Sequence, residues 1–201
     1  MTKVAPQDHA ALPWRITEVA PDFALLDAWA LPATGGPDDF KDLVAVWSAM
    51  DPAADEGSAL SRALFWVRFR LGAWFGWDTE TNTLPIPGHA ETSLRERLPG
   101  DLPALALPEA PVSPFRPIFE TGSEWTAELS NSTVHAVLQL GWVPTGDGNF
   151  RGRLGVYVKP RGRFGNLYMA LIAPFRHYIV YPALLRRVAR AWGARPATVA
   201  S

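Results

Sequence analysis

The strongest candidates for chemistry in this chain are a histidine and a tyrosine one helical turn apart, His177 and Tyr181. A long helix is expected from 166 to 192, and a spacing of four residues places both side chains on one of its faces. Imidazole titrates near neutral pH, so His177 could position or protonate a ligand oxygen, and Tyr168 could contribute from the preceding turns. The alternative is a buried histidine with an ordinary hydrogen bond and a structural role.

The elements that would position a second candidate site are three strands, which alternating polarity predicts over 124–129, 134–142 and 150–158. A two-residue turn at Asn131-Ser132 and a loop over 144–148 would connect them. The pairs expected from these turns are Leu129–Val134, Ala127–Ala136, Trp125–Leu138, Leu138–Leu154 and Val134–Val158.

This register places Glu128, His135 and Tyr157 side by side on the face opposite the apolar one. A carboxylate that orients an imidazole is a catalytic arrangement. That face is expected to be solvated, so a surface ladder of polar side chains is the alternative interpretation. A similar row is expected beside it, formed by Glu124, Gln139 and Arg153.

Charge is distributed unevenly along the chain. Residues 1–150 hold nine basic and 20 acidic side chains, whereas residues 151–201 hold ten basic and none acidic. The basic residues could bind phosphates or anionic lipid headgroups, or they could form an ordinary solvated face that complements the acidic half. They are Lys159, Arg161 and Arg163 in a turn, and Arg186, Arg187 and Arg190 near the end of the helix.

The remaining elements are expected as follows. A strand covers 25–31, and two shorter helices cover 38 or 39 to 50 and 58–75. The second of these helices carries an aromatic cluster from Phe65 to Trp77, which could be core, a pocket wall or an interface. A proline-rich connection follows at 79–114, with a short helix or strand near 93–98.

Other parts of the prediction concern the whole chain. We expect a single domain over 1–201 with flexible tails at 1–13 and 194–201, and a further strand over 115–121. Pro174 and Pro182 should kink or restart the C-terminal helix, whose apolar stripe consists of His177, Tyr181, Leu184, Leu185, Val188 and Trp192.

Several function classes lack support in the sequence. The chain has no cysteine, and no motif for a nucleotide, a metal or a serine nucleophile occurs in it. No metal, cofactor or nucleic-acid partner is therefore expected. Arginine and histidine at the centre of the apolar helix argue against a transmembrane segment, and with no signal-peptide core the expected location is the cytoplasm.

Four long segments resemble the domain of unknown function family 2867, over at least residues 22–192. That family looks similar to the START and polyketide-cyclase superfamily, which implies an α+β helix-grip fold, with a curved antiparallel sheet wrapped around a long C-terminal helix. It also implies a hydrophobic ligand cavity between sheet and helix, and it implies no catalytic residues. The four segments are Glu128-Leu-Ser-Asn-Ser-Thr-Val-His135, Leu140-Gly-Trp-Val143, Val156-Tyr-Val-Lys-Pro-Arg-Gly-Arg-Phe-Gly165 and Tyr168-Met-Ala-Leu-Ile-Ala-Pro-Phe-Arg-His-Tyr-Ile-Val-Tyr-Pro182.

The expected function is the binding of a small hydrophobic or amphipathic molecule, such as a lipid or a polyketide-like compound. Two alternatives are an enzyme that acts on such a ligand through His177 and Tyr181, and a module that binds a protein or an anionic membrane. Whether the chain forms a homodimer is left open. The residues expected to line the cavity are Leu138, Trp142, Leu154, Val156, His177 and Tyr181.

Overall fold

The computed structural model describes residues 2–50, 92–107, 115–131, 134–162, 172–174 and 176–195. The predicted helix at 58–75, with its aromatic cluster, lies outside the described residues. So do Tyr168, Arg163 and much of the 79–114 connection.

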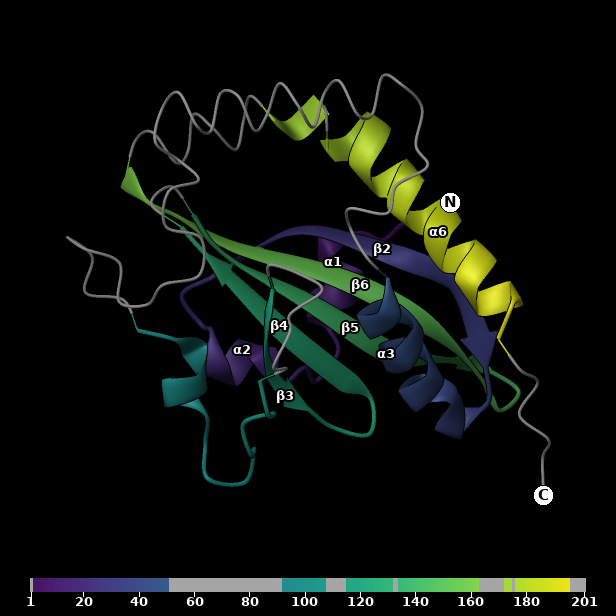
Figure 1. Ribbon diagram of the computed structural model, residues 1–201, viewed down its shortest axis with the longest axis horizontal. Helices are drawn as coiled ribbons and strands as arrows, with labels where there is room; N and C mark the ends of the chain where they lie inside the picture. The colour runs from purple at the N-terminus through teal and green to yellow at the C-terminus, as the bar shows by residue number, and fades with distance from the viewer. Residues whose placement is uncertain are drawn as a thin grey trace.

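The protein contains a curved antiparallel sheet of six strands in the order β1-β2-β6-β5-β4-β3 (Figure 1). The three strands predicted from alternation and the two predicted at 25–31 and 115–121 are confirmed, and the class is α+β. Residues 2–13, expected as a tail, contribute the edge strand β1 and a short helix. The strands are β1 Thr2–Lys3, β2 Ala24–Gly35, β3 Arg116–Glu120, β4 Glu124–Ser130, β5 Val134–Gly146 and β6 Asn149–Pro160.

The predicted register is wrong by two residues in both hairpins. Trp125 pairs with Leu140, and Leu138 pairs with Val156. The first difference arises because Ser130 pairs with His135, so that the connection is longer than the predicted two-residue turn. A shift of two residues keeps every side chain on its predicted face, because the period of a strand is two.

The second hairpin closes more tightly than predicted. Gly146 pairs with Asn149, which leaves only Asp147 and Gly148 in the turn. Both have positive φ, 52° and 72°. This backbone matches the right-handed twist of the flanking strands and favours glycine at the second position.

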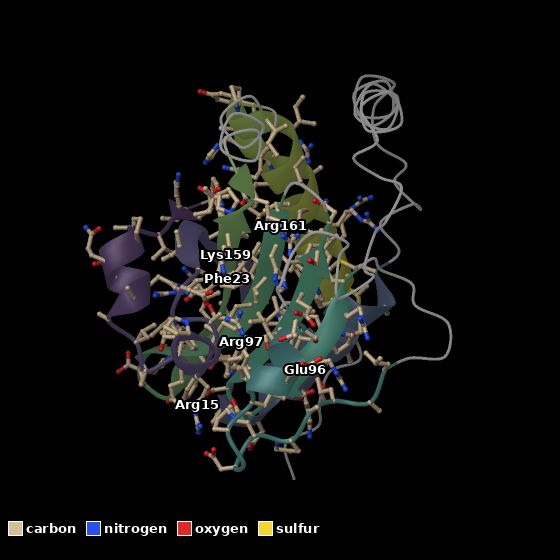
Figure 2. All side chains as sticks on the ribbon, turned by 90° about the vertical axis from the view of Figure 1, so that its left-hand side faces the viewer. Arg15, Phe23, Glu96, Arg97, Lys159 and Arg161 are labelled. Carbon is tan, nitrogen blue, oxygen red and sulfur yellow. The ribbon has the colours of Figure 1, made fainter. Side chains whose placement is uncertain are left out.

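Helices cover both faces of the sheet, and each covered face has its own hydrophobic cluster. Helices α3 (Phe40–Ala49) and α6 (Tyr181–Gly193) pack on one face, around residues that include Leu31, Leu140 and Leu154. The other face is covered by α1 (Pro6–Ala10), α2 (Ile16–Val19) and the 3-10 helix η2 (Leu94–Arg97). Figures 1 and 2 show the sheet between these two sets of helices. The predicted helix after residue 38 is confirmed, and the short element predicted near 93–98 as a helix or a strand is a helix.

The start of α6 is irregular, as its prolines predict. A π-helical turn, η3 (Arg176–Val180), precedes α6, and Pro182 lies in the first turn of α6. Proline is tolerated there because its missing N–H would have no helical partner. The buried face of α6 consists of Tyr181, Leu185, Val188 and Trp192, with Leu184 half-buried, which confirms this part of the predicted stripe.

Close packing of the N-terminal segment depends on a glycine of β5. A Cβ atom at Gly141 would lie 2.3 Å from the ring of Trp14, whereas a Cβ atom at Gly122 would meet nothing within 4 Å. Overpacking of a buried contact typically costs about 1–3 kcal/mol. We therefore expect Gly141→Ala to lower the free energy of unfolding by that amount in urea titrations. Gly122→Ala should change it by less than about 0.5 kcal/mol, and equal effects of the two substitutions would contradict the described packing.

Candidate functional site

Four side chains converge on one carboxylate, that of Asp27 in β2. Lys3 Nζ lies 3.1 Å from Oδ1, and Arg176 Nε donates to Oδ2 at 3.0 Å. His177 Nε2 lies 2.9 Å from Oδ1, and the Tyr181 hydroxyl donates to Oδ2 at 3.0 Å. We call these five residues the Asp27 centre. It unites the two predicted residues, His177 and Tyr181, with three that sequence reasoning missed.

A β-bulge turns Asp27 toward α6. Leu25 pairs with Tyr157, but Asp27 pairs with Val156, so that Leu26 is an extra residue in β2. In a regular strand without this bulge, Asp27 would share the face of Leu25 and point away from α6, since side chains alternate along a strand. The signal in the sequence is a single acidic residue in an otherwise apolar strand.

Asp27 is ionised although it is only 1% exposed. Burial by itself would raise the pKa of this carboxyl. Hydrogen bonds from Lys3, His177 and Tyr181, together with the charge of Arg176, outweigh burial and hold the pKa below its usual value. Burial, with the neighbouring charge of Asp27, raises the pKa of Tyr181. Tyr181 is therefore a neutral hydroxyl that donates a hydrogen bond.

His177 can carry a proton at the atom that faces this carboxylate. Its Nδ1 lies 2.8 Å from the carbonyl oxygen of Ala173, which can only accept, so Nδ1 is the donor. Its Nε2 faces an acceptor, Asp27, and a donor, Lys3 Nζ at 3.2 Å. The imidazolium form donates from Nε2 to Asp27, and the neutral form accepts there from Lys3. The side chain is 28% exposed, so a ligand can reach it.

Two buried N–H groups around the Asp27 centre have no acceptor within the part of the chain that the structure describes. Nε1 of Trp29 and Nη1 of Arg176 are both buried without a hydrogen-bond partner in the structure. The Trp29 ring lies against Tyr181, with 4.9 Å between the ring centroids, and 6.3 Å from the His177 ring. Buried donors normally have partners. The arrangement therefore suits a ligand that supplies an acceptor oxygen.

Apolar side chains extend across the sheet from this centre. The register aligns Asp27 with Val156, Leu138 and Ala127 in successive strands. The next row contains Ala136 and Leu129, which are half-buried, as is Leu138. These side chains leave apolar surface beside the polar centre.

The six residues predicted to line a cavity lie close together. Trp142, Leu154, Val156 and Tyr181 belong to one buried cluster under α6, and Leu138 packs against it. His177 lies at its edge, with its ring 5.8 Å from that of Tyr181. Whether these residues line a ligand cavity remains a prediction.

The second candidate, on the opposite face of the sheet, is only partly assembled. His135 Nε2 contacts Glu128 Oε2 at 2.9 Å, as predicted. Tyr157 lies opposite Val137 instead, and its hydroxyl contacts His9 at 3.1 Å. The expectation that this face is solvated is wrong. His135, Glu128 and Gln139 have no exposed surface, because the N-terminal helices and η2 cover them.

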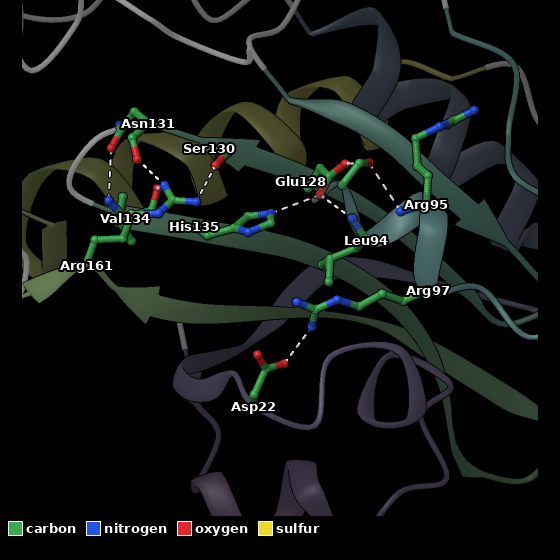
Figure 3. A network of polar contacts seen from close by, with 11 residues as sticks. Asp22, Leu94, Arg95, Arg97, Glu128, Ser130, Asn131, Val134, His135 and Arg161 are labelled. Atoms are coloured by element: carbon green, nitrogen blue, oxygen red, sulfur yellow. Dashed lines mark hydrogen bonds and ion pairs between the residues drawn. The ribbon is translucent and has the colours of Figure 1, made fainter. Parts of the chain in front are cut away.

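The carboxylates on this face hold other segments in place. Glu128 accepts from Ser93 Oγ and from Leu94 N at the start of η2 (Figure 3). Its bonds from His135, Ser93 and Leu94 outweigh burial and lower its pKa. Full burial, together with the bonds that Glu128 accepts from Ser93, Leu94 and His135, favours a structural role for the Glu128–His135 pair.

Glu124 plays the same part for α2 that Glu128 plays for η2, because it accepts hydrogen bonds from the first residues of that helix. It accepts from Arg15 N at 2.6 Å, Ile16 N at 3.1 Å and Gln139 Nε2 at 2.8 Å, at the start of α2. Here burial dominates and raises the pKa. The predicted Glu124–Gln139 neighbours thus meet, whereas Arg153 bonds to the Asp8 carbonyl at 3.2 Å.

The basic residues predicted to form one surface lie in different environments. Lys159 and Arg97 both pair with Asp22, and Figure 2 shows them on either side of Phe23. Arg161 is buried and donates to Ser130 and to carbonyls of the β4–β5 connection. The exposed basic residues on α6 are Arg186 and Arg190.

Two absences hold for the described ranges only. No group of three metal-ligating side chains occurs there, and no helix there is long and apolar enough to cross a membrane.

His9 should make stability depend on pH. Burial lowers its pKa from 6.5 to about 4, although the bond to Gln139 opposes the shift. Between these values the unfolded state binds more protons than the folded state, so stability falls as the pH drops from 6.5 toward 4. We expect the His9 contribution to fall by about 2 kcal/mol between pH 7 and pH 4.5.

The measurement is urea unfolding at both pH values for the native chain and for His9→Gln. The variant should lose less stability between pH 7 and pH 4.5 than the native chain, whatever its stability at pH 7. The same loss in both proteins would show that His9 is not responsible.

Comparison with known proteins gives one match. A family model described as "Protein of unknown function (DUF2867)" matches residues 19–183, which include all of the Asp27 centre except Lys3. Searches of curated proteins and of solved structures find no match. The chain therefore belongs to the DUF2867 family.

Proposed function

We propose that this protein binds a small amphipathic molecule, such as a lipid or a polyketide-like compound, between the sheet and α6. The observation that carries the proposal is the pair of buried donors without acceptors, Trp29 Nε1 and Arg176 Nη1, beside the Asp27 centre. An oxygen of the ligand would complete both hydrogen bonds. Because Lys3, Arg176 and His177 surround the position, that oxygen would be a carbonyl, a hydroxyl or a carboxylate.

The apolar part of the ligand would lie across the neighbouring strands. Leu138 is two strands away from Asp27 in the same row, a distance of about 10 Å from strand spacing. Half-buried Leu138, Ala136 and Leu129 offer the apolar surface. A polar head with a hydrocarbon body of about that length fits this division of polar and apolar side chains.

We also propose that the fold is a helix-grip variant related to the START superfamily. Support comes from the antiparallel sheet and from the way α6 packs on the face that carries the large apolar cluster. Ligand cavities of such folds lie between the sheet and the C-terminal helix. This likeness supports the position of the site and says nothing of the ligand.

An enzyme that acts on the same ligand is the second candidate, which the contact between Asp27 and His177 favours. The carboxylate orients the imidazole, and protonated Nε2 could give its proton to a ligand oxygen. Tyr181 would serve as a hydrogen-bond donor held by Asp27. On this hypothesis His177→Ala abolishes conversion of the bound molecule, followed by mass spectrometry, while the melting temperature stays near that of the native chain.

The test of binding is native mass spectrometry of the freshly purified chain, followed by extraction of any bound molecule. We expect a reproducible amphipathic ligand near one per chain. The same spectrum reports whether the chain is a homodimer. An unliganded mass, with no shift in melting temperature from a panel of fatty acids, fatty alcohols and aromatic polyketides, would contradict the proposal and favour a protein-interaction or membrane-interaction module.

Trp29→Phe tests whether the buried Nε1–H group of Trp29 binds the ligand. The substitution removes an N–H that has no partner in the unliganded chain, so stability without ligand should not fall by more than about 1 kcal/mol. The affinity for the co-purified molecule, or for dodecanoate, should fall about fivefold, which corresponds to one lost hydrogen bond. Arg190→Gln, on the exposed side of α6, is the control and should leave the affinity unchanged. Unaltered affinity in Trp29→Phe would show that this donor does not contact the ligand.

A further inference from the structure

We infer that a second pocket, at the edge of β2 under α6, binds a compact organic anion with a small apolar body. This pocket shares no residue with the Asp27 centre and begins about one helical turn further along α6, at Leu185. The inference is independent of the proposed function, because different side chains carry it.

The pocket exists because β1 covers only a short part of β2. Thr2 and Lys3 pair with Ala30 and Trp29, and no strand covers the edge of β2 beyond them within the described residues. The register of β2 then shifts between Ala30 and Thr34. The end of α6 is fixed above this irregular stretch, since Trp192 Nε1 donates to the Thr34 carbonyl at 3.2 Å.

The space between these elements is small and has an apolar floor. Its volume is about 270 Å³, comparable to about nine water molecules at roughly 30 Å³ each. Leu31, Leu185 and Ala189 supply apolar surface. A ligand of about nine non-hydrogen atoms would fill it.

The charge of the pocket is positive. Arg151 of β6 and Arg186 of α6 both line it, and no acidic side chain does. Neither guanidinium has an ion pair or hydrogen bond to another residue that the structure describes. Strand β6 and helix α6 themselves contain no aspartate or glutamate. Two uncompensated guanidiniums in a concave site attract an anion.

The chemistry of the lining defines the ligand class. Guanidinium groups bind carboxylates and phosphates through paired hydrogen bonds, and Thr2 and Thr34 add hydroxyl groups to the lining. The apolar floor favours an anion attached to a ring or a short hydrocarbon over a free inorganic ion. Benzoate and phenyl phosphate represent the carboxylate and phosphate forms of this class.

The experiment is calorimetric titration of the full chain with benzoate, phenyl phosphate, inorganic phosphate and benzamide, the uncharged analogue of benzoate. We expect benzoate or phenyl phosphate to bind, and benzamide and inorganic phosphate to bind at least about tenfold more weakly. Whichever of the two organic anions binds more tightly identifies the acidic group.

Variants locate the binding. Arg151→Gln and Arg186→Gln should each weaken the preferred anion about tenfold. Arg190→Gln, at an exposed arginine of α6 outside the pocket, should change the affinity less than twofold. The inference is overturned if neither organic anion binds at millimolar concentration, if benzamide binds as well as the preferred organic anion, or if Arg190→Gln weakens binding as much as Arg186→Gln.

Discussion

The structure depends on the burial of one ionised carboxylate. An isolated charge in a protein interior is costly, and it is tolerated only when partners compensate for lost hydration. Asp27 obtains its donors from β1, from η3 and from α6, whose sequence positions are up to 154 residues away. The carboxylate thus ties β1 and α6, which lie near opposite ends of the described chain, to β2. The bulge at Leu26 is necessary, because it directs Asp27 to the face that α6 covers.

Two other buried carboxylates, Glu124 and Glu128, also accept hydrogen bonds from distant segments of the chain. Glu124 and Glu128 hold the starts of α2 and η2 through bonds from backbone N–H groups, and Glu128 also accepts from Ser93. Around Asp27, Trp29 and Arg176 retain buried donors without acceptors among the described residues. The two sites differ in exposure, because Glu128 and His135 have no exposed surface whereas the His177 side chain is 28% exposed. This difference supports a structural role for the opposite face and the binding role proposed for the Asp27 centre. The exposed part of His177 gives the Asp27 centre an approach for a ligand.

Much of the architecture could be predicted from alternation and helical spacing. The strands, their faces and the buried stripe of α6 follow from residue type, because each face has one environment. The register could not be predicted, since the length of the connection after Ser130 depends on bonds such as that from Asn131 N to the Val134 carbonyl. Alternation also does not tell whether a polar face of a sheet is exposed to solvent. The face that carries Glu128, His135 and Gln139 is covered by helices formed from residues 6–19. Asp27 was missed because its partners are remote in sequence.

The most direct test of the account is the coupling between Asp27 and Tyr181. A double-mutant cycle would compare Asp27→Asn, Tyr181→Phe and the combined variant in urea unfolding at pH 7. If the ionised carboxylate fixes α6 through this bond, the coupling free energy should be at least about 1 kcal/mol. Additive effects, with a coupling below about 0.3 kcal/mol, would contradict the central role of Asp27.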